Sequence, residues 1–266
     1  MLREEVAPSS CEQDQRVRHL RLLSFNIQAG IQTTAYRHYF TRGWQHVIAR
    51  DDHQLNLRSI ADLFAEFDVV ALQEIDGGSL RSGFVNQVDF LANHARFPYS
   101  YAQRNRNLGL LGQHGNGVLS RFVPSQVEDH RLPGAIPGRG AMVMTFGDGP
   151  DALAIIGAHL SLSRRARWLQ LNYLAELIMQ YKHVVLMGDL NASLNQLLKD
   201  SPLRRTNLVA PALSHYTYPS WKPAKALDHI LVSPHLKTQN ARTLGSVNSD
   251  HLPLALNIEI PASIMI

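Results

Sequence analysis

The sequence contains a single cysteine, Cys11, among its 266 residues, so no disulfide can form within one chain. One cysteine also excludes zinc sites built from several cysteines at fixed spacing. So little cysteine is typical of a reducing compartment, and we expect a cytoplasmic protein. Residues 1–18 are polar and lack the apolar core of a secretory signal. They are predicted to form a flexible tail before one folded domain, residues 19–266.

Several features that would fix a function class are also absent. No apolar run is long enough to span a bilayer, and there is no repeat or low-complexity tract. The chain has neither the Gly-x-Ser-x-Gly elbow of serine hydrolases nor a phosphate-binding P-loop. Hydrophobic residues make up 45% of the sequence and charged residues 18%, which are ordinary proportions for a globular protein with a buried core.

The charge balance is mildly positive. The formal net charge is +4 when the 13 histidines are counted as neutral, which favours an anionic partner without identifying one. One basic group, Arg164, Arg165 and Arg167, closely follows a candidate functional residue, His159. We expect this group to lie beside the functional site.

Apolar runs of strand length recur along the chain, and several of them end in a polar residue. The runs at 20–27, 68–74 and 183–187 are predicted to be buried strands. Two further runs, 141–146 and 152–160, are separated by Gly-Asp-Gly-Pro, which is a strong turn signal. We therefore predict that these two runs form a hairpin.

Helical spacing of apolar residues separates these strands. Helices are predicted at about 57–67 and 86–95, and Gly-Asn-Gly at 115–117 is predicted to be a turn. A third, longer helix is expected to bury one apolar face, made of Trp168, Leu171, Leu174, Leu177 and Ile178. Alternating strand and helix signals with no linker predict one layered α/β domain around packed sheets, and the hairpins argue against an all-parallel sheet.

Polar residues at the strand ends form the main functional signal. Four carboxylates, Glu74, Asp189, Asp228 and Asp250, lie at edges of apolar strands. Asn26, Asn191, His159 and His251 occupy similar positions. Strand ends of one sheet can converge on a single rim, and crowded carboxylates need a cation because like charges repel. Oxygen ligands with few thiols or imidazoles favour Mg²⁺ or Mn²⁺ over Zn²⁺.

The strand-end segments also carry a resemblance to a known family. These segments are Leu23-Ser24-Phe25-Asn26-Ile27, Leu72-Gln73-Glu74, Gly188-Asp189-Leu190-Asn191, Leu227-Asp228-His229-Ile230 and Ser249-Asp250-His251-Leu252-Pro253-Leu254. In this order they resemble the endonuclease/exonuclease/phosphatase superfamily, which includes deoxyribonucleases, apurinic/apyrimidinic endonucleases, sphingomyelinases, deadenylases and inositol-polyphosphate phosphatases. The resemblance implies a four-layer α/β sandwich of two packed, mainly antiparallel sheets flanked by helices, with the site at one edge.

The resemblance implies a metal site, and at one position near that site this sequence differs from one branch of the family. Glu74 would be the principal ligand of Mg²⁺, or of Mn²⁺, with Asn26 and Asp250 supporting it. Some nucleases of the family carry an acidic residue two places after the first-strand asparagine, and here that position is Gln28. This difference weakens an assignment to that branch.

The resemblance also implies catalytic roles. Asp189 would orient or deprotonate the attacking water, and Asn191 would hold a phosphate oxygen. His251 would donate hydrogen bonds to the phosphate, and His159 would do so from the opposite side. Pairing with Asp228 would fix the tautomer of His251 and favour its protonated form.

Three residues are candidates for substrate binding. Asn116 resembles a position that approaches the substrate phosphate, and a turn residue is the equally weighted alternative. Arg139 resembles a position that is often basic in the family, and a surface arginine is its alternative. Arg164 belongs to the basic group after His159, which could contact backbone phosphates.

Together these features predict a monomeric, divalent-metal-dependent phosphoesterase of the nuclease type, which acts on a phosphodiester, with nucleic acid favoured over phospholipid. A lipid substrate would need an exposed apolar lip, for which the aromatic residues at 36–44 are candidates. A phosphomonoesterase and a non-catalytic binding module with the same fold remain alternatives.

Overall fold

The structure is a computed structural model that describes most of the chain. The described residues are 19–28, 50–79, 85–107, 113–134, 138–211, 215–245, 249–260, 263–264 and 266. The expected tail at 1–18 and the aromatic residues at 36–44 lie outside them.

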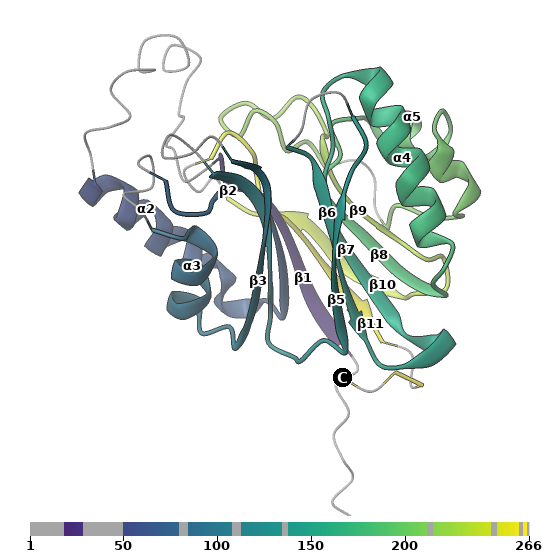
Figure 1. The fold of residues 1–266 in the computed structure, drawn as a ribbon, viewed down its shortest axis with the longest axis horizontal. Helices are drawn as coiled ribbons and strands as arrows, with labels where there is room; N and C mark the ends of the chain where they lie inside the picture. The colour runs from purple at the N-terminus through teal and green to yellow at the C-terminus, as the bar shows by residue number, and fades with distance from the viewer. Residues whose placement is uncertain are drawn as a thin grey trace, which may run out of the picture.

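Two β-sheets form the centre of the fold (Figure 1). The six-stranded sheet has the order β10-β11-β1-β2-β4-β3, with β1 His19–Asn26, β2 Val69–Asp76, β3 Tyr99–Asn107, β4 Gln113–Ser120, β10 Thr238–Thr243 and β11 Leu254–Glu259. The five-stranded sheet has the order β5-β6-β7-β8-β9, with β5 Gln126–Arg131, β6 Gly140–Phe146, β7 Leu153–His159, β8 His183–Asp189 and β9 Asp228–Val232. Only the β1–β2 and β7–β8 pairs are parallel among the described ladders. The predicted mainly antiparallel sheets and the β6–β7 hairpin are therefore confirmed.

Four α-helices of the described chain cover the outer faces of the two sheets. Figure 1 shows α2 (Arg50–Leu63) and α3 (Gln87–Ala95) outside the six-stranded sheet, and α4 (Arg164–Ile178) and α5 (Leu194–Leu198) outside the other. Short 3₁₀ helices at Phe64–Glu66, Gly149–Asp151 and Pro202–Arg205 complete the connections. None of the described helices has the length and apolar character needed to cross a bilayer.

Alternation along the central strands explains the layers. In β1, Leu22 packs into the core between the sheets, whereas Leu23 packs under the helices. In β8, Met187 points between the sheets and Leu186 points toward α4. Because both faces of these strands are covered, their sequences are almost continuously apolar. Three apolar cores thus hold four layers together, as the sequence predicts.

Two elements differ from the sequence-based expectations. Gly115-Asn116-Gly117 lies inside β4 rather than in a turn, because β4 pairs with both β2 and β3 along its length. Trp168 was expected on the buried face of α4, but 51% of it is exposed. The buried face of that helix instead contains Arg167 and Gln170.

Gly188 allows β8 to deliver its last residue, Asp189, to the edge of the sheet. Its φ is +147°, and a Cβ atom at this position would lie 1.8 Å from the carbonyl oxygen of Ala158 on the neighbouring strand. That carbonyl belongs to a strand paired on both sides, so it cannot move away. Only glycine fits this position without strain.

We predict that Gly188→Ala lowers the free energy of unfolding by about 3 kcal/mol or more, because the new methyl group overlaps the backbone. Urea unfolding followed by circular dichroism measures this change. The matched control is Gly245→Ala, since no atom lies within 4 Å of a Cβ there. The control should change the unfolding free energy by less than about 0.5 kcal/mol. Equal losses in both variants would contradict the close-approach argument.

Candidate active site

Strand register brings the predicted polar residues to one edge of the sandwich. In the six-stranded sheet, Asn26 at the end of β1 pairs with Gln73, next to Glu74. In the five-stranded sheet, Asp189 at the end of β8 pairs with both His159 and Asp228. A direct side-chain hydrogen bond between Asn26 and Asp189 joins the two edges. Residues far apart in the sequence therefore form one cluster.

The carboxylate of Asp189 lies at the centre of this cluster and is almost fully buried. Its Oδ2 accepts a hydrogen bond from Asn26 Nδ2 at 3.1 Å, and its Oδ1 accepts one from the backbone amide of Asn191 at 3.1 Å. The Nε2 atoms of His159 and His251 lie 3.4 Å and 3.9 Å from Oδ2. Burial opposes ionisation, but the His159 hydrogen bond and the nearby imidazole charges hold the pKa of Asp189 well below its usual value. Asp189 is therefore a charged acceptor at neutral pH.

Asp228 and His251 form a buried pair beside Asp189. The Nδ1 atom of His251 lies 2.7 Å from Asp228 Oδ2. Burial lowers the pKa of His251, but the charge and hydrogen bond of Asp228 outweigh it and raise that pKa to about 10. The ring of Tyr218, which the sequence did not single out, lies 5.0 Å from the imidazole, measured between ring centroids. The pairing leaves Nε2 of a protonated His251 facing Asp189.

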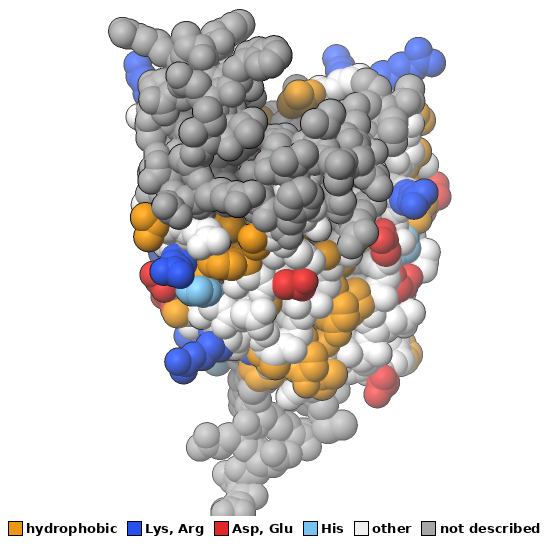
Figure 2. Space-filling view, turned by 60° about the vertical axis from the view of Figure 1, so that its left-hand side comes forward, with side chains coloured by type: hydrophobic (Ala, Val, Ile, Leu, Met, Phe, Trp, Pro, Cys, Tyr) orange, Lys and Arg blue, Asp and Glu red, His pale blue; other side chains and the backbone are white. Residues whose placement is uncertain are grey.

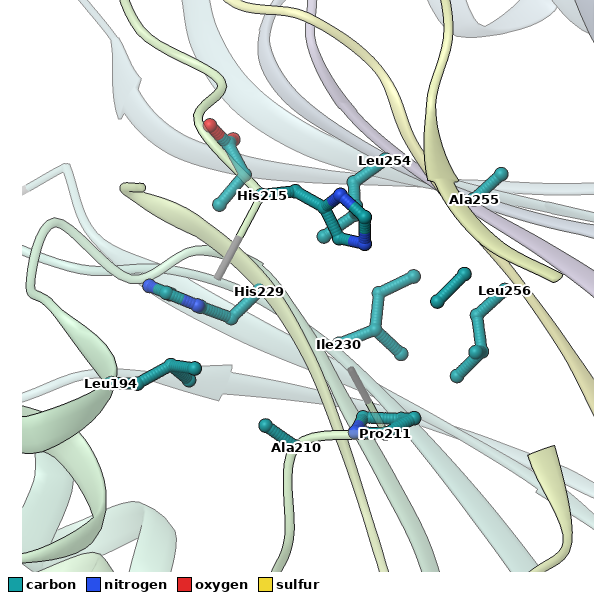
Figure 3. Close-up of a pocket in the computed structure, with 11 residues that line it drawn as sticks. Leu194, Ala210, Pro211, His215, His229, Ile230, Leu254, Ala255 and Leu256 are labelled. Carbon is teal, nitrogen blue, oxygen red and sulfur yellow. The ribbon is translucent and has the colours of Figure 1, made fainter. Parts of the chain in front are cut away.

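A small cavity lies beside Asp228, which is one of its lining residues. Its volume is about 30 Å³, and Ile230, Leu254 and His215 are among the residues that line it (Figure 3). The second oxygen of Asp228, Oδ1, is buried without a hydrogen-bond partner in the described structure. A cavity of this size holds one or two water molecules.

His159 and Arg139 form the opposite side of the cluster. Nη1 of Arg139 lies 2.6 Å from Nδ1 of His159. The same Nη1 atom lies 2.5 Å from Nε2, and a guanidinium group can only donate, so one of the two ring nitrogens must be unprotonated to accept from it. Burial lowers the pKa of Arg139, and the charges of Glu74 and Asp189 partly offset that effect. Arg139 is thus a partly buried cation turned into the cluster rather than a surface arginine.

A β-bulge turns Glu74 toward this group. The register of β2 with β4 shifts between Leu72 and Ile75, and Glu74 has a φ of 55°. A positive φ is rare for glutamate and is typical of functional positions held by their surroundings. Oε1 of Glu74 lies 3.8 Å from Nε2 of His159. The bulge therefore adds a second carboxylate to the Asp189 side of the site.

The acidic residues crowd each other in a way that suits a cation. Burial raises the pKa of Asp250 to about 6, the charge of His251 lowers it, and the charges of Glu74 and Asp189 raise it further. A cation would reverse this mutual repulsion. Gln28 also places a buried Oε1 atom here without a partner among the described residues. The oxygen-rich donor set fits a hard divalent cation.

One group of side chains has ligand atoms close enough to hold a metal ion together. Asp189, Asp228 and His251 each offer one such atom, and these atoms lie within 4.8 Å of one another. This group differs from the predicted ligands Glu74, Asn26 and Asp250, although it adjoins them. Both descriptions put a possible metal site at this edge, and His251 could serve as a ligand only in its neutral form.

The two remaining asparagines are held by their amides. Asn191 has a φ of 51°, and its Nδ2 donates to the carbonyl of Leu160 at 2.9 Å. Asn116 donates from Nδ2 to Gln103 Oε1 at 2.9 Å and to the carbonyl of Gly140 at 3.0 Å, which connects the two sheets. Its Oδ1 is buried with no partner in the described part of the chain. Both side chains are thus fixed near the cluster with an oxygen atom available.

Arg164 lies outside the buried cluster, and Ser249 belongs to it although the sequence did not indicate it. Arg164 is exposed at the first residue of α4. The Oγ of Ser249 donates to the carbonyl of Asn26 at 2.6 Å and accepts from the amide of His251 at 3.2 Å. Its position directly before Asp250 and His251 is the feature of the sequence that could have identified Ser249 as part of the site.

We predict that the imidazole of His251 remains protonated at pH 8 in the wild type and becomes neutral there in Asp228→Asn. The reason is that Asp228 raises the pKa of His251 to about 10, and without its charge burial dominates. Long-range ¹H–¹⁵N NMR spectra of the imidazole, recorded against pH in EDTA, measure this directly. Exposed Asp200→Asn is the control and should leave the titration unchanged. A His251 titration that is identical in all three proteins would rule out this pairing.

Comparisons with known proteins agree with this geometry. A sequence model described as the Endonuclease/Exonuclease/phosphatase family matches residues 23–251. No curated protein sequence matches the chain significantly. Among solved structures, an endonuclease/exonuclease/phosphatase from Beutenbergia cavernae is 18% identical with a TM-score of 0.69, over 93% of this chain and 73% of that one.

Two other similar structures carry more specific names. D. rerio TDP2 complexed with single strand DNA product is 15% identical, with a TM-score of 0.65 over 91% of this chain and 99% of that one. Sphingomyelinase C from Streptomyces griseocarneus is 17% identical, with a TM-score of 0.61 over the same 91% and 99%. At these identities the likeness concerns the fold, whereas the family match spans most of the sequence. The chain therefore belongs to the endonuclease/exonuclease/phosphatase family of metal-dependent phosphoesterases.

Proposed function

We propose that the protein hydrolyses a phosphodiester bond in nucleic acid, with Mg²⁺ or Mn²⁺ as its cofactor. The observation that carries this proposal is the buried Asp189 carboxylate, which lies within 3.4 Å and 3.9 Å of two imidazoles. Hydrolysis of a phosphodiester needs an acceptor for a proton of the attacking water and donors for the phosphoryl oxygens. Asp189 provides the proton acceptor, and the imidazoles provide the hydrogen-bond donors.

The charge states assign these roles. The lowered pKa of Asp189 keeps its carboxylate ionised, so it can orient a water molecule and accept its proton. His251, held protonated by Asp228, can donate from Nε2 to a phosphoryl oxygen. His159 and Arg139 can donate hydrogen bonds to the phosphoryl oxygens from the side of the cluster opposite His251. Asn191 has a second amide hydrogen that it can donate to a phosphate oxygen. Both amide hydrogens of Asn116 are already donated, so Asn116 would instead present its Oδ1 atom, which accepts a hydrogen bond from a substrate donor.

Glu74, Asn26 and Asp250 are the residues that we propose hold the metal ion, with Gln28 close to them. A bound divalent cation would neutralise charge on the phosphoryl oxygens, which the imidazoles alone do only in part. The pKa of Asp250 is raised mainly by its burial and further by the charges of Glu74 and Asp189, and a bound cation would favour its ionised form. A neutral Gln28 in place of an acidic residue lowers the negative charge of the site by one.

Nucleic acid is preferred here because exposed arginines flank the site. Arg164 and Arg165 are exposed at the start of α4, five and six residues after His159 in β7. They can contact backbone phosphates beside the scissile bond. The similar structures include both a protein with a single strand DNA product and a sphingomyelinase, so they do not choose between nucleic acid and phospholipid. Phospholipid headgroups and phosphomonoesters are the alternatives that the test must separate.

We predict metal-dependent cleavage of a nucleic acid in a panel of supercoiled plasmid, abasic duplex, single-stranded RNA, sphingomyelin, a phosphoinositide and bis-p-nitrophenyl phosphate. Each substrate is incubated with Mg²⁺, Mn²⁺ or EDTA. Cleavage should require metal, and added salt should weaken binding of the polymeric substrate steeply. Metal-dependent turnover of sphingomyelin alone would move the substrate to the phospholipid class. Activity that persists in EDTA would contradict the proposed mechanism.

We further predict that Asp189→Asn and His251→Ala each lower kcat by at least about 100-fold, because each removes a proton acceptor or donor. Asp189→Asn preserves the shape of the side chain and removes only its charge. Asp200→Asn makes the same change at an exposed position and should retain wild-type kcat. If Asp189→Asn and Asp200→Asn are equally active, the site is assigned wrongly. If no panel member is cleaved and calorimetry detects no metal binding, the non-catalytic alternative is correct.

A further inference from the structure

The helix that follows the active site carries an unusual exposed surface. Trp168 on α4 is 51% exposed, and Leu162, just before the helix, is 75% exposed. Figure 2 shows a different side of the molecule, the one that carries α2 and α3, where hydrophobic patches lie among a few charged side chains. An exposed tryptophan is costly to leave without a partner because it offers a large apolar ring to water.

Arginine side chains surround Trp168 on this surface. Arg164 and Arg165 precede it by four and three positions, so they lie on the same side of the helix one turn earlier. One turn later, Asn172 accepts a hydrogen bond through Oδ1 from Nη2 of Arg205 at 3.0 Å. We call Arg164, Arg165, Trp168 and Arg205 the α4 platform.

The position of the α4 platform relative to the active site is fixed by hydrogen bonds. Only residues 160–163 separate His159 from α4. Nη1 of Arg167 donates to the carbonyls of Ser161 and Leu162 at 3.0 Å and 2.9 Å. Gln170 holds Ser161 through both its amide atoms. A connection of this length spans at most about 18 Å, so the platform begins within a few nucleotides of the reacting phosphate.

The charge of the platform selects an anionic partner. Three of its four members are arginines, and a fourth arginine, Arg204, is exposed beside Arg205. The single acidic residue of α4, Glu176, accepts a hydrogen bond from Asn172 at 2.9 Å. Phosphate groups complement such a surface, and guanidinium groups are suited to bind them.

The arrangement of apolar groups favours a nucleic acid over a lipid surface. Successive helix residues are separated by about 100°, which places Arg165 and Asn172 between Trp168 and the second exposed apolar residue, Leu169. A helix that inserts into a membrane needs a continuous apolar face. Here charged and polar side chains interrupt it. A single aromatic ring among arginines is instead suited to stack on one base while the arginines contact phosphates.

We propose that the α4 platform binds a single-stranded segment of nucleic acid beside the active site, with Trp168 stacked on a base. A single strand is required because the bases of a duplex already stack on each other and do not offer a free face. This proposal rests on the proposed function in its choice of nucleic acid. It adds a substrate form, single-stranded, and a binding position outside the catalytic cluster.

The test measures binding without turnover. Fluorescence anisotropy of a labelled single strand about 12 nucleotides long, in EDTA, gives the Kd of the full chain. Trp168→Ala should weaken binding about 10-fold, and Trp168→Phe should retain most of the affinity because it keeps an aromatic face. Arg165→Gln and Arg205→Gln should each lower the slope of log K against log salt by about 0.7. The same sequence as a duplex should bind without dependence on Trp168.

Met179→Ala is the matched control, because Met179 is 52% exposed at the other end of the same helix. Equal affinities for Trp168→Ala and Met179→Ala would overturn the proposal. Trp168-dependent binding to phosphatidylcholine–phosphatidylserine vesicles, with no effect on the single strand, would also overturn it in favour of a lipid surface. Metal-dependent turnover of bis-p-nitrophenyl phosphate by the wild type is measured separately. If that turnover is absent while Trp168-dependent binding of the single strand is present, the proposed hydrolysis is wrong and the proposed binding by the α4 platform is supported.

Discussion

The hydrogen bond between Asn26 and Asp189 connects two sheets across the core, and the rest of the site depends on the charged carboxylate that it holds. An isolated buried carboxylate would be strongly destabilising, so Asp189 needs its donors. His159, at the end of β7, supplies a hydrogen bond, and His251 supplies compensating charge. His251 in turn carries that charge because Asp228 lies next to it. The site is thus a chain of mutually dependent charges whose positions are set by strand register.

The central strands were predictable because both of their faces are covered. In β2 and β8 four or more apolar residues follow one another, and in β1 only Arg21 and Ser24 interrupt them, so the polar residue near the end of each strand stands out in the sequence. Strands β5 and β10 were not predicted, because their sequences, QVEDHR and TQNART, are mostly polar. Both are edge strands of their sheets. Edge strands face solvent and often carry charged side chains, so hydrophobic patterning gives them little signal.

The site was predictable as a set of residues but not as a geometry. The strand-end motifs identified Glu74 and Asp189, yet no pattern indicated the β-bulge that gives Glu74 its positive φ. The contact between Arg139 and His159 joins the start of β6 to the end of β7, and it depends on the register of two strands. Such contacts arise from tertiary packing, which local sequence patterns do not encode.

The wrong assignment of Trp168 has a specific cause that bears on function. Buried positions of α4 are occupied by Arg167 and Gln170, which hydrogen-bond the connection after His159. Polar residues therefore take places that hydrophobic patterning reserves for apolar ones, while Trp168 faces solvent. Folding stability alone favours the opposite arrangement, because burying the ring would remove apolar surface from water. In α4, buried polar residues fix the loop beside the active site, and the largest apolar ring of the helix is exposed nearby. Binding of a ligand explains this arrangement better than packing of the core does.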